Sequence, residues 1–594
     1  MPEEIINLAL ETIKMGKQAI VFAPTRSSAE KTAEEISKLT ALMEIELEKD
    51  ILKAASSPTR QCRRLSNCIR KGIAFHHAGL LAKQRDLIED NFKGGKIKII
   101  CATPTLAAGL SMPAYRVLIS SLKRFSGSWG MDWIPVLEYL QMAGRAGRPE
   151  YEKEGQSIVI AKSEKEKIEI YERYVCGDPE EIYSKLAAEP ILRTHLLSLI
   201  SSGIISDQKS MLDFFSETFW AKQFKDMDKL KEILERMLLF LDEVELIDII
   251  GSKERKNKTN GQSSNEKNNK ENTKTNSKKI SYTEFFKAAT SWNSKENSSK
   301  RNISDSANIS KNNKSVDEDR YENEDKKIDE DKFQPTILGK RVAELYLDPY
   351  TARHILDCLK RIRKSRNNDS KENYVEIKSN KSKEIKINAF SYLQMVSHTL
   401  ELRPLLRVKA RDGEKIQEEM IKRMDSLIEE EPSQFDSDEY GEFMNSIKTA
   451  LFFEEWIDEK EEDFLLETFD ITPGEIRVKL ETADWLLYAT EELAKLQSLR
   501  EVVSEIGRLR VRLKEGVREE LLALLKLKGI GRVRGRKLFK AGIKDLGDIK
   551  KIDLTSLTQI LGKALAEDVK KQVGEEIVEI SAGKRTGQLS IDKF

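Results

Sequence analysis

The first 180 residues alternate short runs of β-branched and aliphatic residues with longer stretches that have helical spacing. This alternation predicts a parallel β-sheet covered by helices. The expected strands are QAIVFA from Gln18, GIAFHH from Gly72, KIKIICA from Lys96, YRVLISS from Tyr115 and QSIVIA from Gln156. Such sheets bind ligands in the loops at the carboxyl ends of their strands. We therefore expect the functional residues in those loops.

Helical spacing dominates most of the chain beyond this α/β part. The best-marked helix begins with Thr472, Pro473 and Glu475, which predict an N-cap, a first-turn proline and a capping-box partner. Its apolar stripe consists of Ile476, Leu480, Ala483 and Leu487. Trp485 points to the opposite side of this helix, so we expect it to meet a partner.

Two polar stretches interrupt the pattern. Residues 251 to about 332 are rich in Asn, Lys, Ser and Glu, and a second polar insertion covers about residues 364–386. Such sequences bury too little apolar surface to offset the entropy of the chain, so the first is expected to be disordered. A solvated linker is favoured over nonspecific DNA contacts through its lysines.

Composition narrows the class of protein. Lys and Arg number 101 against 100 Asp and Glu, for a formal net charge of +1, so nucleic-acid binding must come from local patches. The five cysteines include no CxxC pair, which predicts neither a metal site nor a disulfide framework. The sequence has neither an apolar run of roughly 20 residues nor a signal peptide. We expect a cytoplasmic, nucleoid-associated protein without a membrane segment.

The candidate chemistry centres on QMAGRAGRP, residues 141–149. Read as a helix, it places Arg145 and Arg148 on one face, beside Gly144 and Gly147, which let another backbone approach. Such arginines are typical of groups that neutralise a transferring phosphoryl group. The phosphate must be held elsewhere, since the sequence has no GxxxxGK(S/T) loop. The acidic run LLFLDEVE from Leu238 continues an amphipathic helix and is interpreted as helix core.

Three of the expected strand-end loops carry polar or glycine-rich sequences: APTR from Ala23, HHAGL from His76 and ATPTLAAGL from Ala102. In the first, Ser27 and Glu30 predict a capping box for the next helix. Alone, each loop is a weak signal, and His76 and His77 also fit a simple turn. Together with QMAGRAGRP, in this order, the loops resemble motifs IV, IVa, V and VI of superfamily-two helicases. The resemblance is closest to the archaeal Ski-like DNA repair helicases, akin to the helicase part of polymerase theta.

This resemblance implies roles for individual residues. Gln141, Arg145 and Arg148 match the nucleotide-facing motif VI. The residues matched to coupling of the ATP cleft to DNA are Phe22, Thr25, His76, Thr103, Thr105 and Gly109. ATP and Mg²⁺ would be bound mainly by a first RecA-like domain, which the family places ahead of these motifs. We expect a split enzyme whose partner is an N-terminal RecA-like helicase chain, with a truncated product as the alternative.

The resemblance also implies a multidomain fold in which a RecA-like α/β domain precedes mostly α-helical domains. A strand-separating hairpin is expected from Ser121, where Arg124, Phe125, Trp129 and Trp133 either wedge against a base pair or pack the hairpin. The expected ranges are a second RecA-like domain at 1–180, a winged helix at 181–250 with His195 packed, the insert at 251–332, a ratchet domain at 333–500, a helix-hairpin-helix domain at 501–583 and a tail at 584–594.

DNA contacts are expected in the last two domains. In the ratchet helix Trp485 either stacks on a base or packs against a neighbouring domain, and Arg477 and Lys479 are candidates to hold phosphates. Further on, Gly529 and Gly531 between helical runs match a helix-hairpin-helix that exposes amides to phosphate oxygens. A plain basic turn is the alternative. The positive charges there are Arg532, Arg534, Arg536, Lys537 and Lys540.

The chain ends in QLSIDKF, in which Gln588, Ile591 and Phe594 match the Qxx(I/L)xxF core of sliding-clamp-binding peptides, or match it by chance. Taken together, the motifs predict the C-terminal motor part of an ATP-dependent 3′–5′ DNA helicase. Its substrates would be single-stranded and forked or branched DNA in repair and replication restart. A Ski-like RNA helicase and a non-catalytic DNA-binding adaptor are the alternatives.

Overall fold

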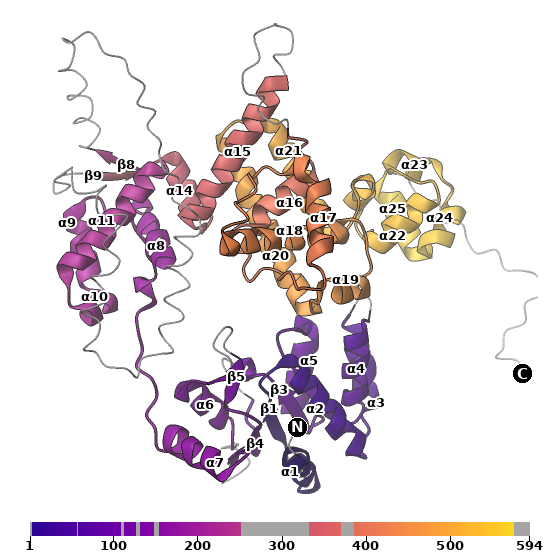
Figure 1. Ribbon diagram of the computed structural model, residues 1–594. Helices are drawn as coiled ribbons and strands as arrows, with labels where there is room; N and C mark the ends of the chain where they lie inside the picture. The colour runs from indigo at the N-terminus through magenta and orange to yellow at the C-terminus, as the bar shows by residue number, and fades with distance from the viewer. Residues whose placement is uncertain are drawn as a thin grey trace, which may run out of the picture.

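The computed structural model describes residues 3–55, 58–107, 112–125, 131–147, 154–250, 332–369 and 385–574. An α/β domain is followed by three mostly helical parts (Figure 1). This arrangement confirms the predicted fold class.

The α/β domain is built on a five-stranded, fully parallel sheet in the order β2-β3-β1-β4-β7. All five predicted strands are confirmed: β1 Ala19–Phe22, β2 Ile73–His76, β3 Ile99–Ala102, β4 Arg116–Ile119 and β7 Gln156–Val159. Every residue of β1 to β4 is buried, because helices cover both faces of a parallel sheet. After β3 the chain crosses β1 to add β4, so the strand order changes direction there and opens a crevice at the carboxyl ends.

The helices and 3-10 turn of this domain follow the strands in alternation. They are α1 Glu3–Lys14, α2 Arg26–Leu39, α3 Ile45–Lys53, α4 Arg60–Ile69, α5 Ala82–Lys93, η1 Pro104–Leu106, α6 Val136–Ala143 and α7 Glu164–Ile170. The predicted capping box of Ser27 and Glu30 is wrong. Thr25 is the N-cap of α2 and accepts a hydrogen bond from the backbone N of Ser28 at 3.1 Å. Glu30 is instead buried against His77.

Between β4 and α6 lies the expected hairpin, formed by β5 Lys123–Phe125 and β6 Met131–Trp133. The strands are antiparallel, with Arg124 opposite Asp132. This confirms the hairpin but not its action on DNA.

The next part contains α8 Glu189–Ser201, α9 Gln208–Ser216, α10 Phe219–Phe224, α11 Met227–Glu243 and β8 Ile247–Ile250. β8 pairs antiparallel with β9 Lys332–Pro335, so the polar insert lies between two strands of one ladder and the predicted boundary at 250 is too early. His195 is exposed, not packed, because the buried stripe of α8 runs through Leu192, Leu196 and Ile200. Leu238 and Leu241 are buried in α11, which confirms the helix-core interpretation.

The central helical part holds α14 Ile337–Glu344, α15 Pro349–Asp369, α16 Ala389–Ser397, α17 Gly413–Lys422, η7 Met424–Ser426, α18 Ser437–Ile457, α19 Glu462–Phe469, α20 Pro473–Leu496 and α21 Arg500–Glu515. The stripe and the Thr472–Glu475 capping box of α20 are confirmed. α15 continues five residues past the predicted start of the second insertion.

The last part has its own core, which begins at Val517 and ends at Val573. It comprises the 3-10 turns η8 Glu519–Leu521 and η9 Leu524–Lys526, followed by α22 Arg532–Lys540, α23 Leu546–Lys551, α24 Leu554–Leu561 and α25 Lys563–Gln572. The predicted boundary at 501 is early, because Val502, Ile506 and Leu509 of α21 are buried in the central helical core.

Candidate functional site

A cleft of about 640 Å³ opens at the carboxyl edge of the parallel sheet. Its walls come from the loops after β1, β3 and β4 and from α6, which are the elements that the crevice rule selects. Five residues predicted from sequence line it: Thr25, Thr103, Thr105, Arg124 and Gln141. Thr25 and Gln141 are 116 positions apart in the chain, yet both line this cleft. A few polar groups brought together in this way are typical of a ligand site.

Two threonines form the floor contributed by the loop after β3. The Oγ1 atoms of Thr103 and Thr105 are 2.8 Å apart, and the backbone N of Thr103 donates to the carbonyl of His76 at 3.3 Å. Thr105 is the second residue of the short turn η1, whose first residue, Pro104, fixes the backbone. The hydroxyls are therefore held in place by local backbone geometry. Gly109 lies outside the described residues.

Basic groups line the hairpin side of the cleft. Nη1 of Arg124 lies 2.9 Å from Oε2 of Glu138, so this exposed guanidinium is already paired. Nζ of Lys123 lies 4.0 Å from the centroid of the Trp133 ring, which also packs tilted against Tyr174. Trp133 therefore packs the hairpin onto the domain. This favours packing over the alternative that Trp133 wedges against a base pair. The side chain of Phe125 and all of Trp129 lie outside the described residues.

Arg145 does not lie on a helix. α6 ends at Ala143 with Gly144 as its C-cap, so the predicted helix through both arginines is wrong. The guanidinium of Arg145 donates from Nε and Nη2 to the carbonyl of Ala107, at 3.2 and 2.6 Å. Its own carbonyl accepts from the backbone N of Ala114 at 2.9 Å. Arg145 is thus tied to the loop after β3, while Arg148 lies outside the described residues.

A close backbone approach occurs next to Arg145, as the glycines predicted. Gly147 has φ +94° and donates its backbone N–H to the carbonyl of Ala114 at 2.7 Å. A Cβ added to Gly155 would lie 2.2 Å from the backbone N of Gly147. Only glycine fits this crossing of two backbones.

His76 and Phe22 do not reach the cleft. His76 is 4% exposed, and its Nε2 lies 3.0 Å from Oε1 of Glu89. Burial, helped by the charge of Arg85, lowers the pKa of His76 to about 4. Phe22 is 1% exposed in β1. Both side chains support the loops from the core and do not line the cleft, and their coupling role stays a prediction.

The loop after β2 contacts the start of α20, a contact that sequence reasoning missed. The backbone N of Gly474 donates to the carbonyl of Gly79 in this loop at 3.0 Å. A second link comes from the start of α2, where Arg26 forms an ion pair with Glu475. A Cβ on Gly474 would lie 2.2 Å from the carbonyl O of Ala78. The available signal was a glycine in the first turn of a helix, where it is costly without a packing reason.

Trp485 has its partner inside the protein. Its Nε1 donates to the carbonyl of Leu345 at 3.2 Å, and the half-buried ring packs against the central core. This favours the packing alternative over base stacking. Lys479 is also engaged, since it is buried and its Nζ donates to the carbonyl of Pro404 at 2.6 Å. Arg477 is exposed on the same helix, as a phosphate contact requires.

The basic residues of α22 fall into two groups, one engaged in contacts within the protein and one with exposed side chains. Arg532 donates to the carbonyl of Lys460 at 2.6 Å, and Arg536 forms ion pairs with Glu459 and Glu520, so both hold α22 to its surroundings. The guanidinium of Arg532 is thus already engaged, and its contact with DNA stays a prediction. The side chains of Arg534, Lys537 and Lys540 are exposed.

The turn before α22 has the predicted glycine geometry. Gly529 has φ +83°, and Gly531 is the N-cap of the helix. Arg534 donates from Nη1 to the carbonyl of Gly529 at 2.8 Å, which braces the turn. The exposed amides at the start of α22 therefore lie beside the exposed basic groups.

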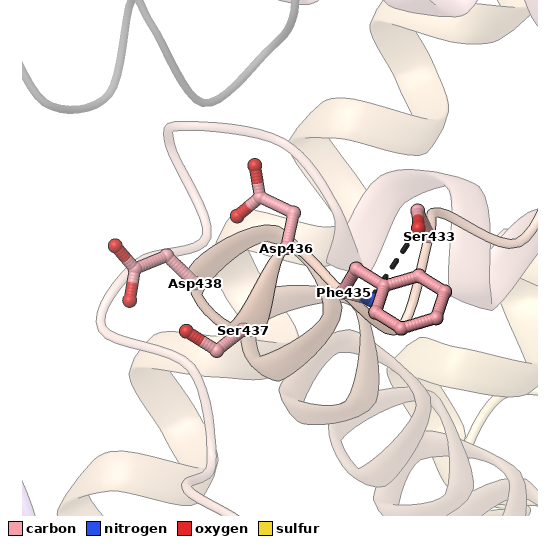
Figure 2. Close-up of a pocket in the computed structure, with 5 residues that line it drawn as sticks. All are labelled: Ser433, Phe435, Asp436, Ser437 and Asp438. Atoms are coloured by element: carbon pink, nitrogen blue, oxygen red, sulfur yellow. Dashed lines mark hydrogen bonds between the residues drawn. The ribbon is translucent and has the colours of Figure 1, made fainter.

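A second hollow of about 450 Å³ lies at the start of α18, far along the chain from these loops (Figure 2). Its lining residues are Ser433, Phe435, Asp436, Ser437 and Asp438. Phe435 is fully exposed, and its backbone N donates to Oγ of Ser433 at 3.3 Å. The acidic lining repels phosphate, and none of the predicted site residues contributes to it.

Comparison with known proteins agrees with this geometry. The family model "Helicase conserved C-terminal domain" matches residues 2–150, and "Archaeal helicase, domain 4" matches residues 390–516. The ATP-dependent DNA helicase Hel308 of Pyrococcus abyssi is 33% identical over 591 residues, covering 98% of this chain and 67% of that protein. The chain belongs to the Hel308 family.

Other Hel308 proteins show the same extent of similarity. The ATP-dependent DNA helicase Hel308 of Methanocella arvoryzae is 31% identical over 588 residues, which cover 97% of this chain and 65% of that protein. This Hel308-family chain therefore spans about two thirds of the length of these relatives, and it includes the helicase conserved C-terminal domain and the parts that follow. Among the described residues, no helix combines the length and apolarity needed to cross a membrane.

Proposed function

We propose that this Hel308-family chain forms the C-terminal part of an ATP-dependent DNA helicase motor. The observation that carries the proposal is the shared cleft, where the loops after β1 and β3 and helix α6 bring Thr25, Thr103 and Gln141 together. The second support is Arg145, whose guanidinium is tied to the loop after β3 and so can link nucleotide state to the cleft. The Hel308 relatives are ATP-dependent DNA helicases, and this adds the substrate class.

Arg145 is suited to meet a phosphate group. Two of its N–H groups now share one neutral carbonyl, that of Ala107. A phosphate oxygen is a stronger acceptor for a guanidinium than a neutral carbonyl is, because both partners are charged. ATP supplies the phosphoryl group, and Arg145 would stabilise its charge from outside the phosphate loop. Gln141, exposed at the end of α6, would orient groups beside it.

The phosphate loop itself comes from outside these 594 residues, which contain no GxxxxGK(S/T) sequence. We propose that a RecA-like domain with this loop, supplied as an N-terminal helicase chain, holds most of ATP and Mg²⁺. The carboxyl edge of the sheet would then face that domain or the DNA that passes beside it.

Single-stranded DNA would run past the exposed cations outside the cleft. Arg477 on α20 and Lys537 on α22 are exposed and would hold phosphates, which gives binding without regard to sequence. Arg534, which also braces the turn before α22, would add its remaining N–H groups. Movement 3′ to 5′ and unwinding of forked DNA in repair and replication restart complete the proposal. The tail residues Gln588, Ile591 and Phe594 lie outside the described part, and clamp binding stays a prediction.

Comparing fork substrates tests the substrate class. The chain combined with a RecA-like domain that carries the phosphate loop should unwind a DNA fork with a 3′ single strand, and should leave an RNA fork of the same sequence largely intact. Equal unwinding of both would favour the RNA helicase alternative. If the combined chains bind the DNA fork but hydrolyse no ATP, the result would favour the alternative of a non-catalytic DNA-binding adaptor. For the tail, a sliding-clamp pull-down should be lost when residues 588–594 are deleted.

A further inference from the structure

A group of chemically reactive side chains lies in the central helical part, outside the cleft. His354 and Cys358 stand one turn apart on α15 and therefore share a face. Glu429 reaches the same point from the segment between η7 and α18. One ligand atom from each of these residues lies within 4.8 Å of the other two.

The spacing of these atoms fits a tetrahedral metal ion. Oε1 of Glu429 lies 3.3 Å from Nε2 of His354. Two ligands that each sit about 2.0–2.1 Å from a tetrahedral zinc ion are about 3.3–3.4 Å apart. The remaining carboxylate oxygen, Oε2, accepts a hydrogen bond from Nδ1 of His398 at 2.6 Å. One oxygen is thus directed at the ligand group, and the other is held by a neighbour, as is usual for carboxylates that bind metals.

Burial and charge favour a cation at this point. Cys358 is 3% exposed, and the side chains of His354 and Glu429 are 13% and 11% exposed. A buried carboxylate is costly unless it is paired with positive charge. Oε1 of Glu429 lies 3.3 Å from Nε2 of His354, but among the described residues no hydrogen bond of good geometry reaches this oxygen. A carboxylate and a thiolate together neutralise a divalent ion, while imidazole adds a neutral donor.

We propose that His354, Cys358 and Glu429 form a zinc-binding site, with a water molecule as fourth ligand. Sulfur and imidazole nitrogen select zinc over magnesium or calcium. His398 is a positioning residue, since it holds the carboxylate and does not bind the ion. Binding releases the thiol proton of Cys358 to solvent. The neutral imidazole of His354 carries its one proton on Nδ1 when Nε2 binds the ion, so Nε2 gives up its hydrogen bond to the carbonyl of Met395, which is 3.0 Å away.

The expected consequence is structural. The ion would tie α15 to the segment that follows η7, and through His398 to the end of α16. α15 and α16 flank the second polar insertion, so the ion would hold together two helices that the chain separates. The sequence predicted no metal site because it contains no CxxC pair. The three proposed ligands come from two segments that are distant in the sequence, so no short sequence motif contains all of them.

The test is a titration of the tag-free full chain with Co²⁺ under anaerobic conditions, after treatment with a chelator. Absorption reports cobalt–thiolate charge transfer. The wild-type chain should bind one equivalent and show this band, and Cys358→Ser should abolish it. The matched control Cys176→Ser removes an exposed cysteine elsewhere and should leave the band unchanged. His398→Asn should keep the band and weaken the affinity about 10–100-fold.

Absence of cobalt binding, or a band that survives Cys358→Ser, would overturn the site. If Cys358→Ser does not fold, X-ray absorption of the zinc-loaded wild-type chain decides instead. A shell with one sulfur at about 2.3 Å supports the site. A shell of nitrogen and oxygen alone contradicts it.

Discussion

Glu30 shows how single residues fix the loops of the cleft. Its buried carboxylate accepts hydrogen bonds from Nε2 of His77 at 3.1 Å and from Nε2 of Gln61 at 2.6 Å, and it pairs with Arg64. Burial alone would raise the pKa of Glu30, but the hydrogen bonds from His77 and Gln61 and the charge of Arg64 outweigh it and lower that pKa. α2, α4 and the loop after β2 therefore meet at one charged group.

The lowered pKa of Glu30 makes the stability of the α/β domain depend on pH. Its contribution is complete above the ordinary value of 4.5 and is lost as the pH falls through the lower folded-state value, since both states are then protonated. Glu30→Gln should reduce the free energy of unfolding by about 1–3 kcal/mol at pH 7 and flatten the acid limb. Urea unfolding of the full chain at a series of pH values measures both effects.

Glu35→Gln is the matched control, since Glu35 lies on the same helix and forms only a 3.9 Å ion pair with exposed Lys31. It should change the unfolding free energy by less than about 0.5 kcal/mol. Equal effects of the two substitutions would mean that the network around Glu30 does not stabilise the fold.

At the scale of elements, the start of α20 links the sheet to the central helices. Gly474 allows the helix to touch the loop after β2, because any Cβ there would meet the carbonyl of Ala78 at 2.2 Å. The backbone of Gly474 and the side chain of Glu475 both bond across the contact. Movement in the cleft can therefore reach the helix predicted to lie along DNA.

Gly474→Ala should force this contact apart and lower fork unwinding more than it lowers DNA binding, because the binding surface itself is untouched. Gly507→Ala is the matched control, since Gly507 lies within α21 with open space around its Cβ position. That change should stabilise the helix by about 0.5–1 kcal/mol and leave unwinding intact. Unwinding rates and fluorescence binding curves of both variants decide the point. Normal unwinding by Gly474→Ala would contradict the link.

α22 offers a second element-scale prediction, because adjacent cations on it have different partners. Lys537→Ala removes an exposed charge and should weaken DNA binding while reducing the salt slope by about one. Arg536→Ala breaks the ion pairs with Glu459 and Glu520 and should mainly lower the melting temperature. Binding isotherms at several salt concentrations, with melting curves, separate the two effects. The opposite pattern would show that Arg536, not Lys537, faces DNA.

Features that depend on nearby residues could be predicted from the sequence, and contacts between distant residues could not. The five strands were predicted correctly because β-branched runs bounded by loops leave a local signal, and the start of α20 because capping chemistry is local. The partners of Trp485, Arg532 and Arg536 were not predictable, since they are groups distant in the sequence. Arg145 was predicted to lie on a helix, but Gly144 ends α6 and places it in a turn.

At the scale of the whole molecule, polar contacts connect the parts in series. The sheet domain meets α20 through Arg26 and Glu475, and α22 of the last part meets the segment before α19 through Arg536 and Glu459. The Arg26–Glu475 ion pair is the more exposed of the two, and such a pair breaks and reforms at little cost. The Arg536–Glu459 pair is more buried and holds α22 in place. The first joint therefore suits parts that shift relative to one another during a cycle.

The most direct measurement is DNA-stimulated ATP hydrolysis by this chain together with a RecA-like domain that carries the phosphate loop. Arg145→Ala should lower the turnover rate by roughly 1,000-fold while the melting temperature stays close to that of the wild type. Arg70→Ala removes an exposed arginine just before β2, at the opposite edge of the sheet, and should leave the turnover rate unchanged. Equal turnover by the wild type and Arg145→Ala would contradict the proposed role of this domain in the motor.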